Sequence, residues 1–385
     1  MSQPVIIKNV GLMLSGDFDR PVLDSDSLII EDGKIAAHGR GLDVPEKAAV
    51  IDARGCALCP GLIDSHCHVV LGDYTPRQQT QNFLESLLHG GVTTAVSAGE
   101  VHLPGRPKDR AGVKALAVLA AKSWAIYRPG GLKVLGGAVI LEKGLTEADF
   151  EEMAREGVKV VGEIGLGSVK DPEEAAVMCR WARKYGMKVM MHSGGTSIPG
   201  SSVVGFDQIS KVRPDIISHI NGGPTAMSLD EAKLVVDRTD SAVEIVQCGN
   251  VKRAAQVVEY LQERGQAHRL ILGNDAPSGT GVVPLGLLRN ISWLASLGGL
   301  DPALAVCAAT GNTAGVFGLD RGRIAPGLEA DLIFLDAPLG SAGQDVLSAL
   351  AEGDTPGVSI VMIDGRVVVT SSRNTPPPLR RAVAV

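Results

Sequence analysis

The stretch VKVVGEIGLGSVKDPEEAAVMCRWARKYGMKVMMH, residues 158–192, has the pattern of a strand, a helix and a second strand. Its two ends are the short apolar runs VKVVGE (158–163) and MKVMMH (187–192). Between them, DPEEAAVMCRWARKYG (171–186) begins at an Asp, which caps helix N-termini, and ends at a Gly, which favours the C-terminal turn. Strands joined by a helix of this length pair in parallel, so the stretch predicts a βαβ unit of a parallel sheet.

The same alternation continues on both sides of this stretch, from about residue 60 to residue 320. Eight apolar runs occur, at 61–66, 91–97, 132–140, 158–163, 187–192, 215–219, 242–247 and 269–275. Helix-length segments separate them, among them 146–157 and 250–265, which also begin at a capping residue and end at Gly. Eight βα units in about 250 residues are typical of an α/β fold, the (β/α)8 TIM barrel. An open doubly wound sheet is the alternative, and the count of eight favours the barrel.

The two ends of the chain have a different pattern, of short strands and turns. Asp-Gly dipeptides at 32–33 and 364–365 lie between apolar runs and predict β-hairpins. Because both ends share this turn chemistry, we expect them to pair into one small β-sandwich domain. The predicted organisation is residues 1–59 as the N-terminal part of the sandwich, 60–321 as the barrel and 322–385 as the C-terminal part of the sandwich. The Pro-rich and basic final segment, 373–385, is predicted to be a trailing arm.

Residue types that bind metals stand at the carboxyl ends of five of the predicted strands, the face of such a barrel that carries the active site. They are His66, His68, Glu163, His192, His219 and Asp275. Each has a simpler explanation when taken alone. A single histidine at a strand end is more often hydrogen-bonded to backbone or water, Glu163 could be an isolated general base, and Asp275 could cap the next helix. Together, four imidazoles and two carboxylates at one face favour a metal centre.

The number of ligands indicates two metal ions rather than one, because a catalytic zinc usually takes three protein ligands and a water. The first ion would be bound by His66, His68 and Asp275, and the second by His192 and His219, with the Glu163 carboxylate as the bridge. Imidazole and carboxylate ligands suit two divalent ions, at least one of them zinc, either as two zinc ions or as a mixed iron–zinc pair. Such a pair supplies hydroxide as the nucleophile near neutral pH, and Asp275 beside it would carry the proton to the leaving group.

The composition excludes several kinds of partner. The 385 residues are 45% hydrophobic and 21% charged, and the net charge is −6. This negative balance and an aromatic content of 3% argue against a nucleic-acid partner. No apolar stretch reaches the ~18 residues of a membrane span, and the six scattered cysteines are typical of a reducing cytoplasm. We therefore expect a cytoplasmic protein that has no membrane partner.

An ordered set of motifs spans nearly the whole chain. They are PGLIDSHCH (60–68), MMHSGG (190–195), SHI (218–220), LGNDAP (272–277) and TGNTAGVFGLDRGRIAPGLEADLIFLD (310–336). This set resembles the amidohydrolase superfamily, and within it the cyclic amide hydrolases. Many dinuclear members bridge their metals with a carboxylated lysine, whereas this chain has Glu163 at that position. Lys159 lies four residues earlier, at the wrong depth of the strand to replace it.

The resemblance implies a cytoplasmic homotetramer that opens the lactam ring of a small cyclic amide. The implied substrate is 6-oxo-1,4,5,6-tetrahydronicotinate, and the implied products are 2-formylglutarate and ammonia, released when the ring-opened enamine hydrolyses. A carboxylate-bearing lactam needs hydrogen-bond donors near the mouth of the barrel. The polar candidates that follow strands five, six and seven are Ser193, Thr196, Asn221 and Gln247. The cationic candidates in loops after strands two, three and four are Arg106, Lys108, Lys143 and Lys170.

Two other functions stay open from the sequence. One is a mononuclear zinc deaminase of a ring amidine, which would hold one metal per subunit where the lactam hydrolase would hold two. The other is a metal-free assembly protein on the same scaffold. Such a protein is expected to have lost several ligands, and this chain retains all six.

Overall fold

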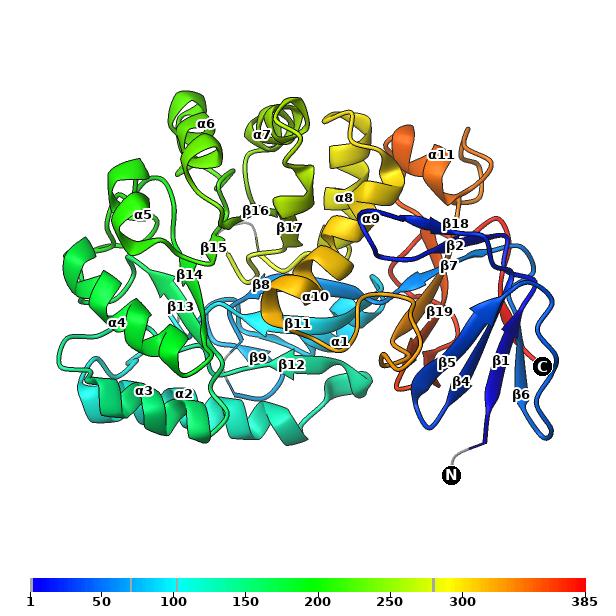
Figure 1. The fold of residues 1–385 in the computed structure, drawn as a ribbon, viewed down its shortest axis with the longest axis horizontal. Coiled ribbons are helices and arrows are strands. Elements are labelled where there is room, and N and C mark those ends of the chain that lie inside the picture. The colour runs from blue at the N-terminus through cyan, green and yellow to red at the C-terminus, as the bar shows by residue number, and fades with distance from the viewer. Residues whose placement is uncertain (1–2, 70, 102, 279–280) are drawn as a thin grey trace.

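The structure, a computed structural model, describes residues 3–69, 71–101, 103–278 and 281–385. Its larger part is a ring of parallel strands with helices on the outside (Figure 1). The strands are β8 (Leu62–Cys67), β11 (Val92–Ser97), β12 (Lys133–Leu135), β13 (Val160–Ile164), β14 (Lys188–Met191), β15 (Ile216–Ile217), β16 (Ala242–Val246) and β17 (Leu270–Gly273). They match the eight predicted apolar runs one for one.

The barrel strands belong to two parallel sheets that meet at both edges. One sheet has the order β12-β11-β8 and the other β13-β14-β15-β16-β17. Parallel backbone bridges between Cys67 and Ala276 and between Val139 and Val161 join them. The ring is therefore closed, which confirms the (β/α)8 barrel and excludes the open doubly wound sheet.

The helices begin and end near the predicted signals. The outer ones are α1 (Phe83–Leu88), α2 (Arg110–Ile126), α3 (Glu147–Arg155), α4 (Pro172–Lys184), α5 (Phe206–Val212), α6 (Leu229–Arg238), α7 (Val251–Glu263), α8 (Gly286–Ser296) and α9 (Pro302–Ala308). In α4, the Asp171 side chain accepts a hydrogen bond from the first turn, and Gly186 follows the last turn with a φ of 79°. Among the described residues, no helix has both the length and the apolar character needed to cross a membrane.

A layer of apolar side chains fills one end of the barrel. Ile63, Val160 and Ile271 belong to it, together with Phe317 of α10 (Gly311–Phe317). The Asn312 side chain of α10 donates to the carbonyl of Leu270, the first residue of β17, at 3.0 Å. The short helix α10 therefore lies at the amino ends of the strands, and the opposite end is left for polar side chains.

The sandwich is built from both ends of the chain, which lie together in Figure 1. Its five-stranded sheet has β21 (Val383–Ala384), β6 (Ala49–Asp52), β1 (Val5–Lys8), β4 (Ser27–Glu31) and β5 (Lys34–Gly39) in this order. Its six-stranded sheet has β20 (Arg366–Val369), β19 (Gly357–Ile363), β18 (Leu332–Asp336), β7 (Ala57–Pro60), β2 (Leu12–Leu14) and β3 (Val22–Leu23). Buried side chains of both sheets, such as Ile30 and Phe334, form one core, which confirms the sandwich.

Both predicted hairpins are present. Asp32 and Gly33 have φ of 47° and 78° between β4 and β5, and Asp364 and Gly365 have φ of 49° and 71° between β19 and β20. Two successive residues at positive φ define the type I′ turn, which Asp-Gly favours because its twist matches that of paired strands.

The prediction of a trailing arm at 373–385 is wrong. Residues Val383–Ala384 form β21, which pairs with the edge strand β6, and Leu379 N donates to the Ala337 carbonyl at 2.8 Å. The Arg380 guanidinium makes two hydrogen bonds of 2.7 Å with Asp336, a buried carboxylate. A buried carboxylate needs a counter-ion, and an open sheet edge needs a partner, so the basic segment packs despite its prolines.

An ion-pair cluster connects the barrel to the sandwich. Lys133, at the start of β12, is 5% exposed, and its Nζ lies 2.8 Å from Glu329, 2.9 Å from Asp331 and 2.6 Å from Asp364. Asp331 is itself buried, and burial raises the pKa of its carboxyl. The cation therefore compensates a carboxylate that would otherwise be isolated from water.

We expect Lys133→Ala to lower the free energy of unfolding by about 3–5 kcal/mol, because removing one partner of a buried pair leaves the other uncompensated. Urea denaturation followed by circular dichroism measures this loss. The matched control is Lys159→Ala, an exposed lysine just before β13. It should change stability by less than about 0.5 kcal/mol. Equal losses of stability from the two substitutions would contradict the role of Lys133 as the counter-ion of the buried carboxylate.

Candidate metal centre

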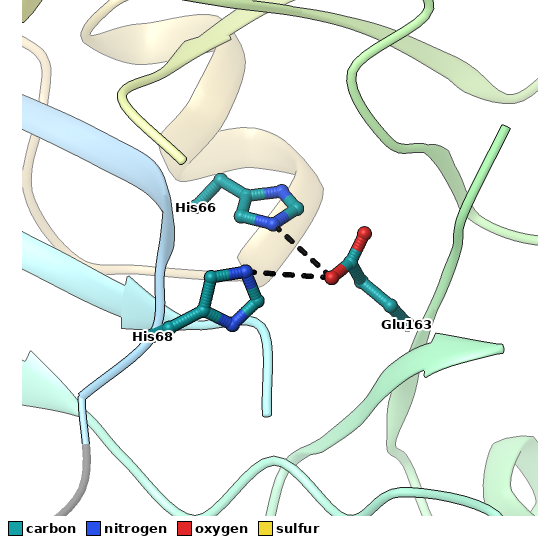
Figure 2. Close-up of side chains that lie close together, drawn as sticks. All are labelled: His66, His68 and Glu163. Carbon is teal, nitrogen blue, oxygen red and sulfur yellow. Dashed lines mark ion pairs between the residues drawn. The ribbon is translucent and has the colours of Figure 1, made fainter. Parts of the chain in front are cut away.

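All six predicted ligands lie at the carboxyl end of the barrel, and all six come together. His66 is the last residue but one of β8 and His68 follows that strand, Glu163 lies in β13, and His192 follows β14. His219 and Asp275 follow β15 and β17. Figure 2 shows His66 and His68 pointing from one side toward the Glu163 carboxylate on the other. The structure thus gathers side chains that are more than 200 residues apart in the sequence.

The first group of donor atoms consists of the Nε2 atoms of His66 and His68, Asp275 Oδ1 and Glu163 Oε2. Glu163 Oε2 lies 3.6 Å from His66 Nε2 and 3.4 Å from His68 Nε2. Asp275 Oδ1 lies 3.5 Å and 3.1 Å from the same two nitrogens. We call this group the first site.

The second group uses the other oxygen of the same carboxylate. Glu163 Oε1 lies 2.5 Å from His219 Nε2 and 3.8 Å from His192 Nδ1, and the two nitrogens are 3.2 Å apart. We call this group the second site. Because Glu163 contributes one oxygen to each group, its carboxylate can bridge the two sites.

The spacing of the donors fits metal coordination. Bonds of about 2.0–2.2 Å in a tetrahedral zinc site separate neighbouring donor atoms by about 3.3–3.6 Å. The separations in the first group, 3.1–3.6 Å, lie close to this range. Those in the second group spread from 2.5 to 3.8 Å, and its shortest contact, between His219 and Glu163, has the length of a hydrogen bond. In addition, His66 Nε2 and His219 Nδ1 are buried nitrogens without a hydrogen-bond partner in the described part of the chain. The unpaired nitrogen of His66 faces the first site, as expected of a ligand atom.

The electrostatics of the cluster point in the same direction. Burial opposes ionisation of Glu163, but His66 and His219 outweigh it and hold the pKa of its carboxyl well below the ordinary value. Burial likewise opposes charge on His66, yet Glu244, Glu163 and Asp275 raise its pKa well above the ordinary value. The buried carboxylates of the cluster thus favour a positive charge close to them, and a bound cation supplies such a charge.

Local backbone irregularities aim the ligands. The pairing of β13 with β14 shifts register between Val161 and Ile164, on either side of Glu163. The pairing of β11 with β8 shifts opposite His66 as well. His219 and Asp275 have positive φ angles, 34° and 55°. Residues other than glycine adopt this backbone conformation in only a few per cent of cases. Bulges and such outliers are typical of positions where function dictates where a side chain points.

Two buried acids that we did not predict support the ligands. Glu244 of β16 accepts hydrogen bonds from His66 Nδ1 at 2.7 Å and from Ser65 Oγ at 2.5 Å. Asp64 accepts from the Asn274 backbone N at 2.9 Å and from its side chain at 2.6 Å. Both acids stand inside apolar strand runs, AVEIVQ and GLIDSH. A charged residue in such a run is the signal that identifies them, because buried charges require partners.

Asp275 differs from the other ligands in two respects. Its side chain is 17% exposed, whereas those of the other five residues are at most 6% exposed. Its Oδ1 faces His66 and His68, and its Oδ2 lies 3.1 Å from the Sγ of Cys248. Cys248 is a further residue near the site that we did not predict from the sequence. Asp275 therefore stands between the interior of the site and its opening.

The four polar candidates for substrate binding lie in different environments. Ser193 Oγ donates to the Ser218 carbonyl at 2.8 Å, and Asn221 exchanges two hydrogen bonds with the backbone of Val246. Thr196 is exposed after β14, and Gln247 is half-buried at the end of β16. The first two side chains are occupied by bonds that hold the loops.

The cationic candidates are also unlike one another. Arg106 pairs with the buried Glu142 at 2.7 Å, and Lys170 donates to the Gly165 carbonyl at 3.0 Å. Lys108 and Lys143 are exposed. Lys159, the residue considered as a lysine bridge, is exposed before the start of β13, at the opposite end of the strand from Glu163.

Comparison with known proteins identifies close relatives. A family model described as the amidohydrolase family matches residues 226–368. Enamidase of Eubacterium barkeri is 58% identical over 380 residues, which are 98% of this chain and 98% of that protein. An adenine deaminase of Ruegeria sp. (strain TM1040) is 27% identical over 330 residues, 82% of this chain and 51% of its own length.

Solved structures agree with the sequence comparison. The crystal structure of an enamidase superposes with a TM-score of 0.97 at 57% identity, over 100% of both chains. D-hydantoinase (dihydropyrimidinase) from Thermus sp. has a TM-score of 0.66 at 20% identity, over 96% of both chains, and supports the fold alone. The resemblance seen in the sequence motifs is confirmed, and the chain belongs to the amidohydrolase family.

Proposed function

We propose that this protein is a dinuclear metal-dependent hydrolase that opens a lactam ring, as an enamidase does. The observation that carries the proposal is the pair of donor groups that share Glu163, found in a chain 58% identical to enamidase. The substrate we propose is 6-oxo-1,4,5,6-tetrahydronicotinate. Water adds to the ring carbonyl, the ring C–N bond breaks, and the resulting enamine hydrolyses to 2-formylglutarate and ammonia.

The residues would divide this work as follows. His66, His68 and Asp275 would hold the first divalent ion, His192 and His219 would hold the second, and the Glu163 carboxylate would serve both. The ions, when bound, polarise the amide carbonyl and lower the pKa of water to near neutrality. Asp275, the most exposed of the six, takes the proton from the attacking water and delivers it to the ring nitrogen as the C–N bond breaks. The buried imidazoles keep bulk water from the other side of the site.

Of the polar candidates, we propose Thr196 and Gln247 as contacts to the substrate. Ser193 and Asn221 are bound to backbone groups and would have to give up those bonds to reach a ligand. For the substrate carboxylate we propose the exposed Lys108 and Lys143 over Arg106, which is paired with Glu142. We also propose that the protein is a cytoplasmic homotetramer, on the sequence resemblance alone, and sedimentation velocity tests the subunit count.

A substrate panel tests the proposed activity. Metal-replete protein is assayed for ammonia release and ring opening on cyclic imides, hydantoins, dihydropyrimidines and oxotetrahydropyridine carboxylates. We expect the highest kcat/KM on the last class. The matched control is 6-oxotetrahydropyridine without the carboxylate, which should be a poorer substrate because the anionic contact is lost. Preferred turnover of a hydantoin or a dihydropyrimidine would contradict the proposed substrate while keeping the reaction class.

The second candidate is a deaminase of a ring amidine. Its support is the sequence similarity to adenine deaminases, such as that of Ruegeria sp., which is 27% identical to this chain. Metal analysis separates the two functions. We expect about two divalent ions per subunit after anaerobic purification, at least one of them zinc, either as two zinc ions or as a mixed iron–zinc pair. One ion per subunit together with deamination of adenine would favour the second candidate.

A further inference from the structure

Glu244 contacts both halves of the metal centre without belonging to the six ligands. It lies in the middle of β16, and it is fully buried. Its Oε2 accepts hydrogen bonds from His66 Nδ1 at 2.7 Å and from the backbone N of His219 at 3.1 Å. Its Oε1 accepts from Ser65 Oγ at 2.5 Å. Both oxygens are therefore committed to donors that surround the ligands.

The support that the four imidazoles receive is unequal. His68 Nδ1 and His192 Nε2 face the backbone carbonyls of Gly99 and Gly195, at 3.0 Å and 2.7 Å. His219 Nδ1 is buried and has no hydrogen-bond partner in the part of the chain that the structure describes. Among the four, His66 has the carboxylate as its partner. A carboxylate fixes the tautomer of an imidazole and makes its other nitrogen a stronger metal donor than a carbonyl does.

The two sites therefore differ in more than the number of ligands. The first site has a ligand with carboxylate support. In the second site, a carbonyl holds His192, and the outer nitrogen of His219, Nδ1, has no hydrogen-bond partner among the described residues. The contact of Glu244 with the second site reaches only the backbone of His219, not its ring. The effect of Glu244 on metal binding should thus be concentrated at the first site.

We propose that Glu244 is a positioning residue that makes the first site the tighter of the two metal sites. The inference rests on the dinuclear centre of the proposed function, but not on its substrate. The negative charge of Glu244 holds the proton on His66 Nδ1, so the lone pair of Nε2 faces Glu163 and Asp275. When metal is scarce, the first site fills before the second.

Single-site variants of the full chain test the assignment. His192→Ala removes a ligand of the second site, and His68→Ala removes a ligand of the first. Glu244→Gln is then added to each, since glutamine keeps the shape and Ser65 Oγ can accept from its amide. The metal-free proteins are titrated with Zn²⁺ in competition with a chromophoric chelator, and no substrate is present.

With His192→Ala, we expect Glu244→Gln to weaken Zn²⁺ binding by about 10–100-fold, the usual effect of losing the partner of a ligating histidine. With His68→Ala, we expect a change of less than about threefold. Ser65→Ala in the His192→Ala protein is the control. It removes the bond from Ser65 Oγ and leaves the bonds from His66 and from the backbone of His219, so the affinity should stay close to that of its parent.

Three results would overturn the proposal: an unchanged first-site affinity, equal weakening of both sites, or a loss with Ser65→Ala as large as with Glu244→Gln. The last two would mean that Glu244 only maintains the packing. If Glu244→Gln fails to fold, Glu244→Asp keeps the charge but withdraws it by one methylene. It should weaken the first site selectively, and no loss would overturn the proposal. Absence of lactam hydrolysis would refute the substrate and leave these affinities meaningful.

Discussion

Replacing Asp275 with Asn should lower kcat by about 10²–10⁴-fold, the usual contribution of a general acid–base group. The amide keeps the shape of the side chain and one oxygen that can face His66 and His68. It cannot take up a proton from water and return it to the ring nitrogen. The fold and most of the bound metal should therefore remain while turnover is lost. Steady-state kinetics together with elemental analysis of the same sample separates loss of chemistry from loss of metal.

The matched control for Asp275→Asn is Asp240→Asn, at an exposed aspartate before the start of β16. This change should leave both kcat and metal content unaltered. A protein with Asn at position 275 that turns over at near the normal rate would remove Asp275 from the mechanism. A protein that has lost both metal ions would show that its role is ligation alone.

Replacing Glu163 with Gln should reduce the metal content from about two ions per subunit to about one. The neutral amide offers one weak oxygen where the carboxylate offers two charged ones, and a bridge needs both. The loss should fall mainly on the second site, which keeps only His192 and His219, whereas the first keeps three other ligands. Elemental analysis and Zn²⁺ titration measure the remaining ions. Retention of two ions per subunit would contradict the bridging role.

The same residue predicts how activity returns after metal removal. A lysine bridge must first react with CO₂, whereas Glu163 already carries its carboxylate. Stripped enzyme should therefore regain full activity with divalent metal alone in CO₂-free buffer. The control is Lys159→Ala, which should recover equally well because Lys159 is exposed before the start of the strand. Reactivation that depends on bicarbonate would mean that the bridge has been assigned incorrectly.

Much of the fold and all six proposed ligands could be predicted from the sequence because both rest on periodic, local signals. Each barrel strand is a short apolar run, and each ligand stands at or just after the end of such a run. The eightfold count then places these ends on one face. The Asp-Gly turns likewise act through two adjacent residues, and both hairpins formed as expected.

Other features depend on contacts that no local pattern contains. Glu244 is one charged residue in an apolar run, and its bond to His66 joins residues 178 positions apart. The packing of the segment 373–385 depends on the buried Asp336 and on the free edge of β6. Basic and proline-rich composition indicates only that a segment avoids regular structure by itself. In both cases, contacts with residues distant in the sequence determine the structure.

The positive φ of His219 and Asp275 has a consequence for the abundance of the protein in a cell. A left-handed conformation costs a residue with a side chain up to about 1–2 kcal/mol, and less for Asp and His than for most, so the metal-free chain carries part of this cost at both positions. Ions that bind only the folded chain raise its stability by mass action. A shift of about 1–2 kcal/mol is enough to change the steady-state level of a protein several-fold through proteolysis of its unfolded form. The amount of this hydrolase should therefore follow the supply of metal even at constant synthesis.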